Sequence, residues 1–164
     1  MSPAAPLAAA LLFATLAQPA PAAEPGRDIQ GWWLESDEIN CALTKWVGED
    51  MLMLIGPSEH SAGGLAISSP AIADVRAGDD PALETRFDAE APVTRAATGV
   101  PAAEGEPGGY VILLPLDALV RARPHGFTLT VSRAGAPVYT FDATAAGPGM
   151  AALMDCSKAF AKAP

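Results

Sequence analysis

The sequence predicts an α+β fold, in which a mainly antiparallel β-sheet of short strands is combined with a short middle helix and a C-terminal helix. Short segments that alternate apolar and polar residues recur along the chain, separated by turns rich in Gly, Pro and Asp. Two segments show instead the 3.6-residue spacing of an amphipathic helix. Strands and helices do not alternate as they do around a parallel sheet, which disfavours a dinucleotide-binding fold.

The strands are predicted from period-two alternation between turn signals. Leu83, Thr85 and Phe87 alternate with charged residues, as in a strand with one buried face. Residues 48–50 form a turn between two such segments, which indicates a hairpin. Residues 23–30 resemble a polar lead-in. We expect a sheet of about seven strands. The candidate segments are 32–35, 40–47, 51–55, 65–68, 83–88, 93–98, 110–114, 127–131 and 138–142, of which 93–98 has the weakest pattern and 110–114 is a strand or a lead-in.

The two helices follow from apolar spacing and from Pro and Gly at their ends. Pro115 suits the first turn of the middle helix, which a turn at residues 124–126 ends. Its apolar face would be Leu116, Leu119 and Val120. Residues 147–149 open the final helix, which we expect to run from Met150 to about Phe160. Its apolar stripe, predicted to face the sheet, is Met150, Leu153, Met154, Cys156 and Phe160.

Residues 1–22 have the pattern of a signal peptide. The apolar run from Leu7 to Ala17 is too short to span a membrane and has the length of a signal-peptide core. A small-residue site follows, with cleavage after Ala22 or Ala23. No Lys or Arg precedes the run, so an Ala- and Pro-rich tail, or a start other than Met1, is the alternative. We expect residues 23–164 to form a single α+β domain without a membrane span, in the periplasm or secreted.

The chain is acidic, with 19 Asp and Glu, 10 Lys and Arg, and a formal net charge of −9. Such a chain does not bind nucleic acid or an anionic membrane surface through charge neutralisation. The acidic residues concentrate in the first half of the domain. Their pairs fall at turns, where we interpret them as solvated hairpin tips; a cation site or an acidic docking face is the alternative. The pairs are Asp37-Glu38, Glu49-Asp50 and Asp79-Asp80.

Cys41 and Cys156 are the two cysteines of the chain. Export to an oxidising compartment favours a disulfide between them, which would tie the start of the domain to its last helix. The chain-entropy model credits closure of a loop of about 100 residues with roughly 4 to 5 kcal/mol. Free buried thiols or a functional thiol remain as alternatives, but the spacing excludes a C-x-x-C redox motif.

Catalytic motifs are weak. His60 lies between two serines in the segment 58–61, but sequence neighbours do not form a triad, whose members converge in space. His125 falls in a predicted turn. No nucleophile-elbow or phosphate-loop motif is present. A small hydrolase therefore stays an alternative that requires one histidine in a pocket beside a nucleophile.

Two further groups of residues are candidates for binding. Met51 and Met53 share one face of a predicted strand, and together with His60 they offer thioether and imidazole ligands that suit copper(I). The competing interpretation, which we favour, is that both methionines face the core. Trp32 and Trp33 are adjacent in a strand and must point to opposite faces, so one of them is expected to be exposed as part of a binding surface.

Three features near the ends of the mature chain are found together: an early tryptophan at position 32 or 33, Cys41, and the segment from Tyr139-Thr140-Phe141 to Ala151-Ala152-Leu153. In these features the chain resembles the invasion-associated locus B family of small periplasmic proteins from alphaproteobacteria. The likeness covers the two ends of the mature chain. It implies an exported, non-enzymatic envelope protein and carries over no catalytic residue. We therefore expect a soluble periplasmic protein that needs no cofactor and binds an unidentified protein or small molecule of the envelope.

Overall fold

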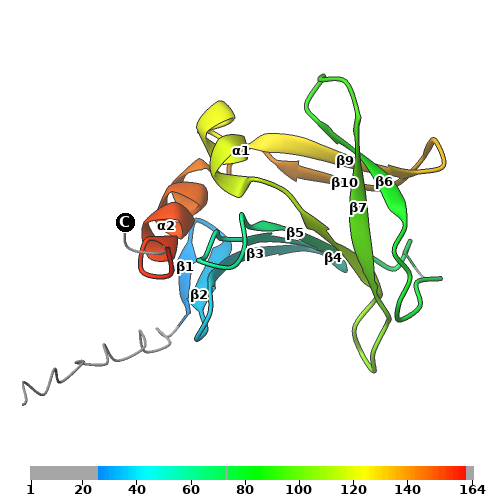
Figure 1. Cartoon of the computed structure of the whole chain (residues 1–164), viewed down its shortest axis with the longest axis horizontal. Coiled ribbons are helices and arrows are strands. Elements are labelled where there is room, and N and C mark those ends of the chain that lie inside the picture. The colour runs from blue at the N-terminus through cyan, green and yellow to red at the C-terminus, as the bar shows by residue number, and fades with distance from the viewer. Residues whose placement is uncertain (1–25, 73, 162–164) are drawn as a thin grey trace, which may run out of the picture.

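The computed structural model describes residues 26–72 and 74–161, so the predicted signal peptide lies outside the described residues. Within them, ten strands form one sheet in the order β1-β2-β3-β4-β5-β8-β7-β6-β9-β10, and every neighbouring pair is antiparallel (Figure 1). The strands are β1 (Arg27–Ile29), β2 (Trp32–Ser36), β3 (Cys41–Val47), β4 (Asp50–Ile55), β5 (Gly64–Ser68), β6 (Ala82–Phe87), β7 (Val93–Val100), β8 (Gly109–Leu113), β9 (Phe127–Arg133) and β10 (Ala136–Ala143). The helices are α1 (Leu116–Ala122) and α2 (Gly147–Ser157).

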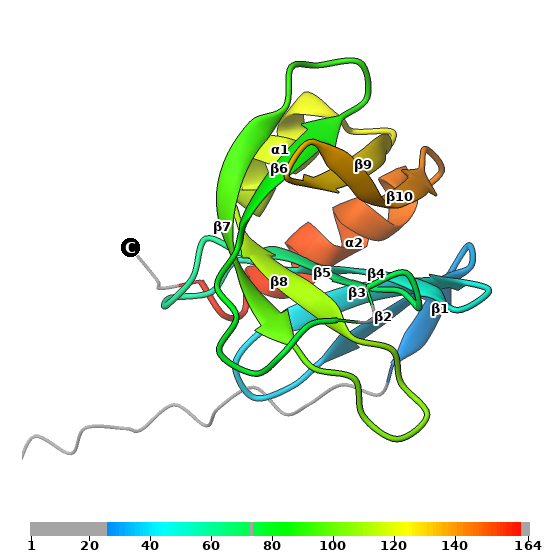
Figure 2. The same ribbon diagram turned by 90° about the vertical axis from the view of Figure 1, so that its right-hand side faces the viewer.

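The sheet is curled into a half-barrel, so that β9 and β10 face the half formed by β1 to β5, with α2 between them (Figure 2). Each strand buries the side chains that point into the curl. In β3, Cys41 and Leu43 point inward and are fully buried, and their β4 neighbours Leu52 and Leu54 lie on the same side. One hydrophobic cluster fills the curl. The core therefore joins both halves of the sheet around α2.

Side chains, rather than a backbone ladder, connect the last strand to the first half of the sheet. Phe141 in β10 meets the ring of Trp32 in β2 edge to face, with ring centroids 6.3 Å apart. Tyr139 stacks on Phe141, and its hydroxyl donates a hydrogen bond of 2.7 Å to the carbonyl of Met51 in β4. Such aromatic pairs contribute about 0.5–1.5 kcal/mol beyond their buried area.

Helix α2 packs closely on β2 and β3 because small residues face the sheet. A Cβ at Gly149 would lie 2.9 Å from Leu43 Cδ2, and one at Gly56 would overlap the Ser157 hydroxyl. The predicted Cys41–Cys156 disulfide is confirmed, and it links β3 to the last turns of α2 across a sequence separation of 115. It holds the helix inside the curl.

The predicted α+β class, mainly β, agrees with the structure in its coarse form, but two details differ. The sheet has ten strands rather than about seven, and β1 forms in the segment expected to be a polar lead-in. Gln30 and Gly31 both have positive φ and join β1 to β2 in a two-residue turn. Gln at the first turn position gives no hairpin signal, which is why the pattern was missed. Among the described residues, no helix has the length and apolar character needed to cross a membrane.

Helix α2 also begins earlier than expected, at Gly147 instead of Met150. Pro148 occupies the first turn, where its missing N–H leaves no helical hydrogen bond unmade. The predicted inward stripe is present in part: Met150 and Leu153 are buried, whereas Met154 is only half-buried.

We expect reduction of the disulfide to lower the free energy of unfolding by about 2–5 kcal/mol, because the unfolded chain regains the freedom of a long loop. The midpoint of urea unfolding, followed by far-ultraviolet circular dichroism with and without dithiothreitol, measures this change. The Cys41→Ala, Cys156→Ala double variant should start from the lower midpoint and not respond to the reductant. The prediction would be contradicted if dithiothreitol did not change the urea midpoint of the wild-type protein.

We expect Tyr139 to make the protein sensitive to alkaline pH. Burial raises the pKa of the Tyr139 hydroxyl far above its ordinary value, and the negative charge of Asp50 raises it further. The unfolded state therefore releases this proton above a pH of about 10 while the folded state retains it, so stability present below that pH is lost as pH rises. In urea titrations at increasing pH, the free energy of unfolding should fall less steeply for Tyr139→Phe than for the wild type. The two slopes should differ by up to about 1.4 kcal/mol per pH unit. Parallel curves for both proteins would refute this.

Candidate functional site

The outer face of the first half of the sheet carries a group of tryptophan and methionine side chains, of which the tryptophans are exposed and the methionines half-buried. Register places Trp33, Thr44 and Met53 side by side across β2, β3 and β4. The next row places Trp46 of β3 beside Met51 of β4. We call these five residues the tryptophan face. Because their side chains point away from the curl, none of them is needed to fill the core.

The two adjacent tryptophans have opposite environments, as strand alternation requires. Trp32 is 1% exposed in the core, whereas Trp33 is 47% exposed and Trp46 is 53% exposed. The indole N–H of Trp33 donates a hydrogen bond of 3.2 Å to Glu35, two residues along the same strand. A Cβ at Gly26 would overlap the Trp33 ring, so the backbone before β1 packs against this indole. These contacts hold the ring in place while leaving half of it accessible.

Two hollows of ≈ 270 Å³ and ≈ 250 Å³ lie side by side on the tryptophan face. Trp46, Met51 and Met53 line both of them, so the hollows adjoin along the strands. Trp33 and Glu35 complete the first hollow, and the second reaches across β5 to the loop before β8. Together they form an elongated depression with an aromatic wall, which fits an extended ligand better than a compact one.

Thr44 lies at the floor of the first hollow between the two exposed indoles. Its hydroxyl is buried and has no hydrogen-bond partner among the described residues. A buried hydroxyl without a partner costs about 1–3 kcal/mol. A polar group of a ligand that displaced the neighbouring side chains would recover this free energy.

The tryptophan face is surrounded by acidic groups. Glu35 lines the first hollow, Glu106 lines the second, and Asp28 is the cross-strand neighbour of Trp33. No basic residue is among the described residues that line either hollow. From β1 to β5, Arg27 and Lys45 are the basic residues, against the seven acidic residues Asp28, Glu35, Asp37, Glu38, Glu49, Asp50 and Glu59. The electrostatic potential over this face is therefore negative and favours cations.

The interpretation that Met51 and Met53 face the core is wrong. The inward residues of β4 are Leu52 and Leu54, and both methionines line the outer hollows. The copper alternative required His60 beside them. His60 lies instead in the turn beyond Ile55, 80% exposed, with its Nε2 2.8 Å from Glu59. It lines neither hollow, so the three predicted ligands do not come together.

The geometry that a small hydrolase requires is also missing from the described part of the chain. His60 and His125 are both in exposed turns, and neither ring forms a hydrogen bond with a serine hydroxyl there. Ser61 accepts a hydrogen bond from Gly63 N, which holds the turn. The hydrolase alternative thus has no histidine placed beside a nucleophile in the described residues.

The acidic pairs at the turns do not gather into a cation site. In the described ranges, no three His, Cys, Asp or Glu side chains are placed to hold a metal ion. Asp37 accepts hydrogen bonds from the backbone N–H groups of Ile39 and Asn40, which stabilises the turn between β2 and β3. This matches the interpretation of that pair as part of a hairpin tip.

Sequence reasoning missed Thr44, Trp46 and Glu35 as members of the site. The alternation of β3 contained the signal, since Cys41 must point inward to reach α2 and Trp46 is an odd number of residues away. Searches of protein-family models, curated proteins and solved structures find no match to this chain. The functional inference therefore depends on the geometry and charge of the face itself.

We expect a cationic quencher to reach the exposed indoles more easily than an anionic one. A single unit charge at about 7 Å in water changes the local ion concentration roughly threefold. The same charge lowers the local concentration of iodide by the same factor, so quenching constants for caesium and iodide, each normalised to free N-acetyltryptophanamide, should favour caesium by up to about sevenfold. Glu35→Gln should reduce the preference, because it removes the charge but keeps an oxygen for Trp33 Nε1. Equal or stronger quenching by iodide would show that the face is not electronegative.

Proposed function

We propose that this protein is an exported, non-catalytic binding module whose tryptophan face binds an extended basic segment of a partner protein. The observation that carries the proposal is the combination of two exposed indoles, two thioethers and bordering carboxylates over adjoining hollows, with no basic residue lining them in the described chain. Aromatic faces next to carboxylates are well suited to hold guanidinium and ammonium groups.

A basic side chain would gain from both parts of this surface. Its charged group can lie over the face of Trp33 or Trp46, where cation–π attraction is worth about 0.5–1 kcal/mol at an exposed site. Its aliphatic stem can contact Met51 and Met53, whose flexible side chains adapt to irregular partners. Glu35 supplies the opposite charge within the same hollow.

The shape of the face favours a segment of chain over a single small molecule. Met51, Met53 and Trp46 are shared by both hollows, so neighbouring side chains of one extended ligand can occupy them in turn. Strand residues lie about 3.3 Å apart and alternate in direction, which allows every second side chain of such a ligand to point toward the sheet.

Export remains part of the proposal and is supported by two observations. The first residues have the signal-peptide pattern, and the Cys41–Cys156 disulfide is of the kind that persists in oxidising compartments. The resemblance to the invasion-associated locus B family would place the protein in the bacterial envelope, where its partner would then be found.

The test compares two peptides that differ only in charge, acetylated hexa-arginine amide and its hexa-citrulline analogue. We expect hexa-arginine to change the tryptophan fluorescence saturably at low ionic strength, with affinity that falls as salt is added. Hexa-citrulline, which has the same shape without the charge, should bind about tenfold more weakly or not at all.

Variants locate the binding on the sheet. Glu35→Gln and Trp46→Leu should each weaken hexa-arginine binding by about threefold to tenfold. Glu38→Gln, an identical charge change in the exposed turn after β2, is the matched control and should have little effect. The proposal fails if citrulline and arginine peptides bind equally, or if Glu38→Gln weakens binding as much as Glu35→Gln.

A further inference from the structure

A separate cleft of ≈ 250 Å³ lies between the β6–β7 hairpin and α1, on the inner face of the sheet. In the register of β6 and β7, Val93 pairs with Thr85 and Arg95 pairs with Leu83. Val93 and Arg95 therefore lie on the same side of the sheet as the buried residues of β6. Apolar side chains from three elements form most of its walls, among them Phe87, Val93 and Leu119. Two arginines, Arg95 and Arg123, reach into this apolar cleft.

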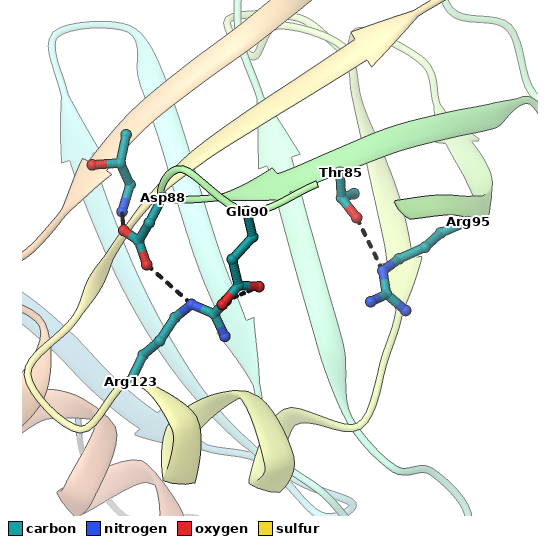
Figure 3. A network of polar contacts seen from close by, with 6 residues as sticks. Thr85, Asp88, Glu90, Arg95 and Arg123 are labelled. Carbon is teal, nitrogen blue, oxygen red and sulfur yellow. Dashed lines mark hydrogen bonds and ion pairs between the residues drawn. The ribbon is translucent and has the colours of Figure 1, made fainter. Parts of the chain in front are cut away.

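Arg123 is neutralised within the protein. Its side chain is 10% exposed, and its Nε lies 3.1 Å from Asp88 Oδ2, while Nη2 forms an ion pair with Glu90 (Figure 3). Its guanidinium also lies over the ring of Phe87 at 5.1 Å. Asp88 in addition accepts a hydrogen bond of 2.8 Å from Thr128 N. This network fixes the β6–β7 turn to the end of α1 and leaves no charge of Arg123 unmatched.

Arg95 is positioned but not neutralised. Its Nε donates a hydrogen bond of 3.0 Å to the hydroxyl of Thr85, which is 1% exposed and itself donates to the carbonyl of Val93. Within the described part of the chain, no carboxylate forms an ion pair with Arg95. Figure 3 shows its terminal nitrogens extending beyond Thr85, without a marked interaction to the residues drawn. The guanidinium thus presents two parallel donors to the cleft.

We infer that this cleft binds a small organic anion, a carboxylate with a short apolar body, through Arg95. A guanidinium matches a carboxylate in a bidentate pair, and a partly buried charge gains from such a partner because the pair replaces lost hydration. The apolar walls would cover the body of the ligand. Thr85, which also lines the cleft, is a positioning residue, since its hydroxyl holds Nε of Arg95 and so orients the fork.

The chain and the proposed ligand are both negatively charged, so only groups close to the ligand can attract it. A net charge of −9 repels anions at long range, so the attraction must come from Arg95 within the cleft. Glu90 also lines the cleft, but its carboxylate forms an ion pair with Arg123 rather than with Arg95. An uncharged analogue of the ligand therefore separates the effect of charge from that of apolar burial.

The experiment is a titration of the folded, disulfide-bonded protein with hexanoate and with hexanamide, followed by two-dimensional amide NMR. We expect saturable shifts of the backbone signals of Thr85, Arg95 and Leu119 with hexanoate, and about tenfold weaker binding of hexanamide. Arg95→Gln should reduce hexanoate affinity about tenfold. Arg86→Gln, the same change at an exposed neighbour on β6, should leave it unaltered.

A variant of Thr85 tests its role in positioning Arg95. Thr85→Val, which keeps the shape of the side chain, should weaken binding less than Arg95→Gln and more than Arg86→Gln. If Arg95→Gln does not fold, the comparison of hexanoate with hexanamide on the wild-type protein still decides the role of charge. Equal binding of the acid and the amide, unchanged affinity in folded Arg95→Gln, or shifts confined to other residues would each overturn the inference.

Discussion

The attachment of α2 to β3 through the Cys41–Cys156 disulfide is the constraint on which the rest of the structure depends. The helix follows β10 after a short connection, so fixing the helix also fixes the last strand. Phe141 of β10 can then meet Trp32 of β2, and Tyr139 can reach the Met51 carbonyl. These contacts connect the two halves of the curl, whose end strands share no backbone ladder. A sheet that lost the helix would expose the inner side chains of β2 and β3, on which α2 packs.

The same constraint determines which side chains remain outside. Because Cys41 must point inward, alternation places Leu43 inward and Trp46 outward. The two-residue turn at Gly48 and Glu49 then sets the register, in which Trp46 is opposite Met51. The tryptophan face is thus the counterpart of the core: the alternation that turns Leu43 inward leaves Trp46 exposed on the other side of the sheet.

The sequence contained most of the strand and helix positions, but less of the site. Period-two patterns located the main strands because one face of each is buried, and the opposite environments of Trp32 and Trp33 followed from adjacency alone. The run MLMLI in β4 was ambiguous, since both of its faces are apolar and alternation cannot choose between them. Only the pairing with β3, read together with the disulfide, resolves it. The short β1 carried too few residues for a pattern.

Contacts between residues distant in sequence explain what pattern reasoning could not reach. Arg123 and Asp88 belong to different elements, and the Thr85–Arg95 bond depends on the β6–β7 register. The negative net charge argues against partners that need a basic surface for long-range attraction. It is, however, a sum over the whole chain, and the two faces of the sheet carry different charged groups. Carboxylates border the outer face at Trp33, whereas the inner cleft presents the guanidinium of Arg95 without an acidic partner in the described residues. Because the screening length is about 8 Å at physiological ionic strength, a ligand at either face would respond to these local groups rather than to the total charge.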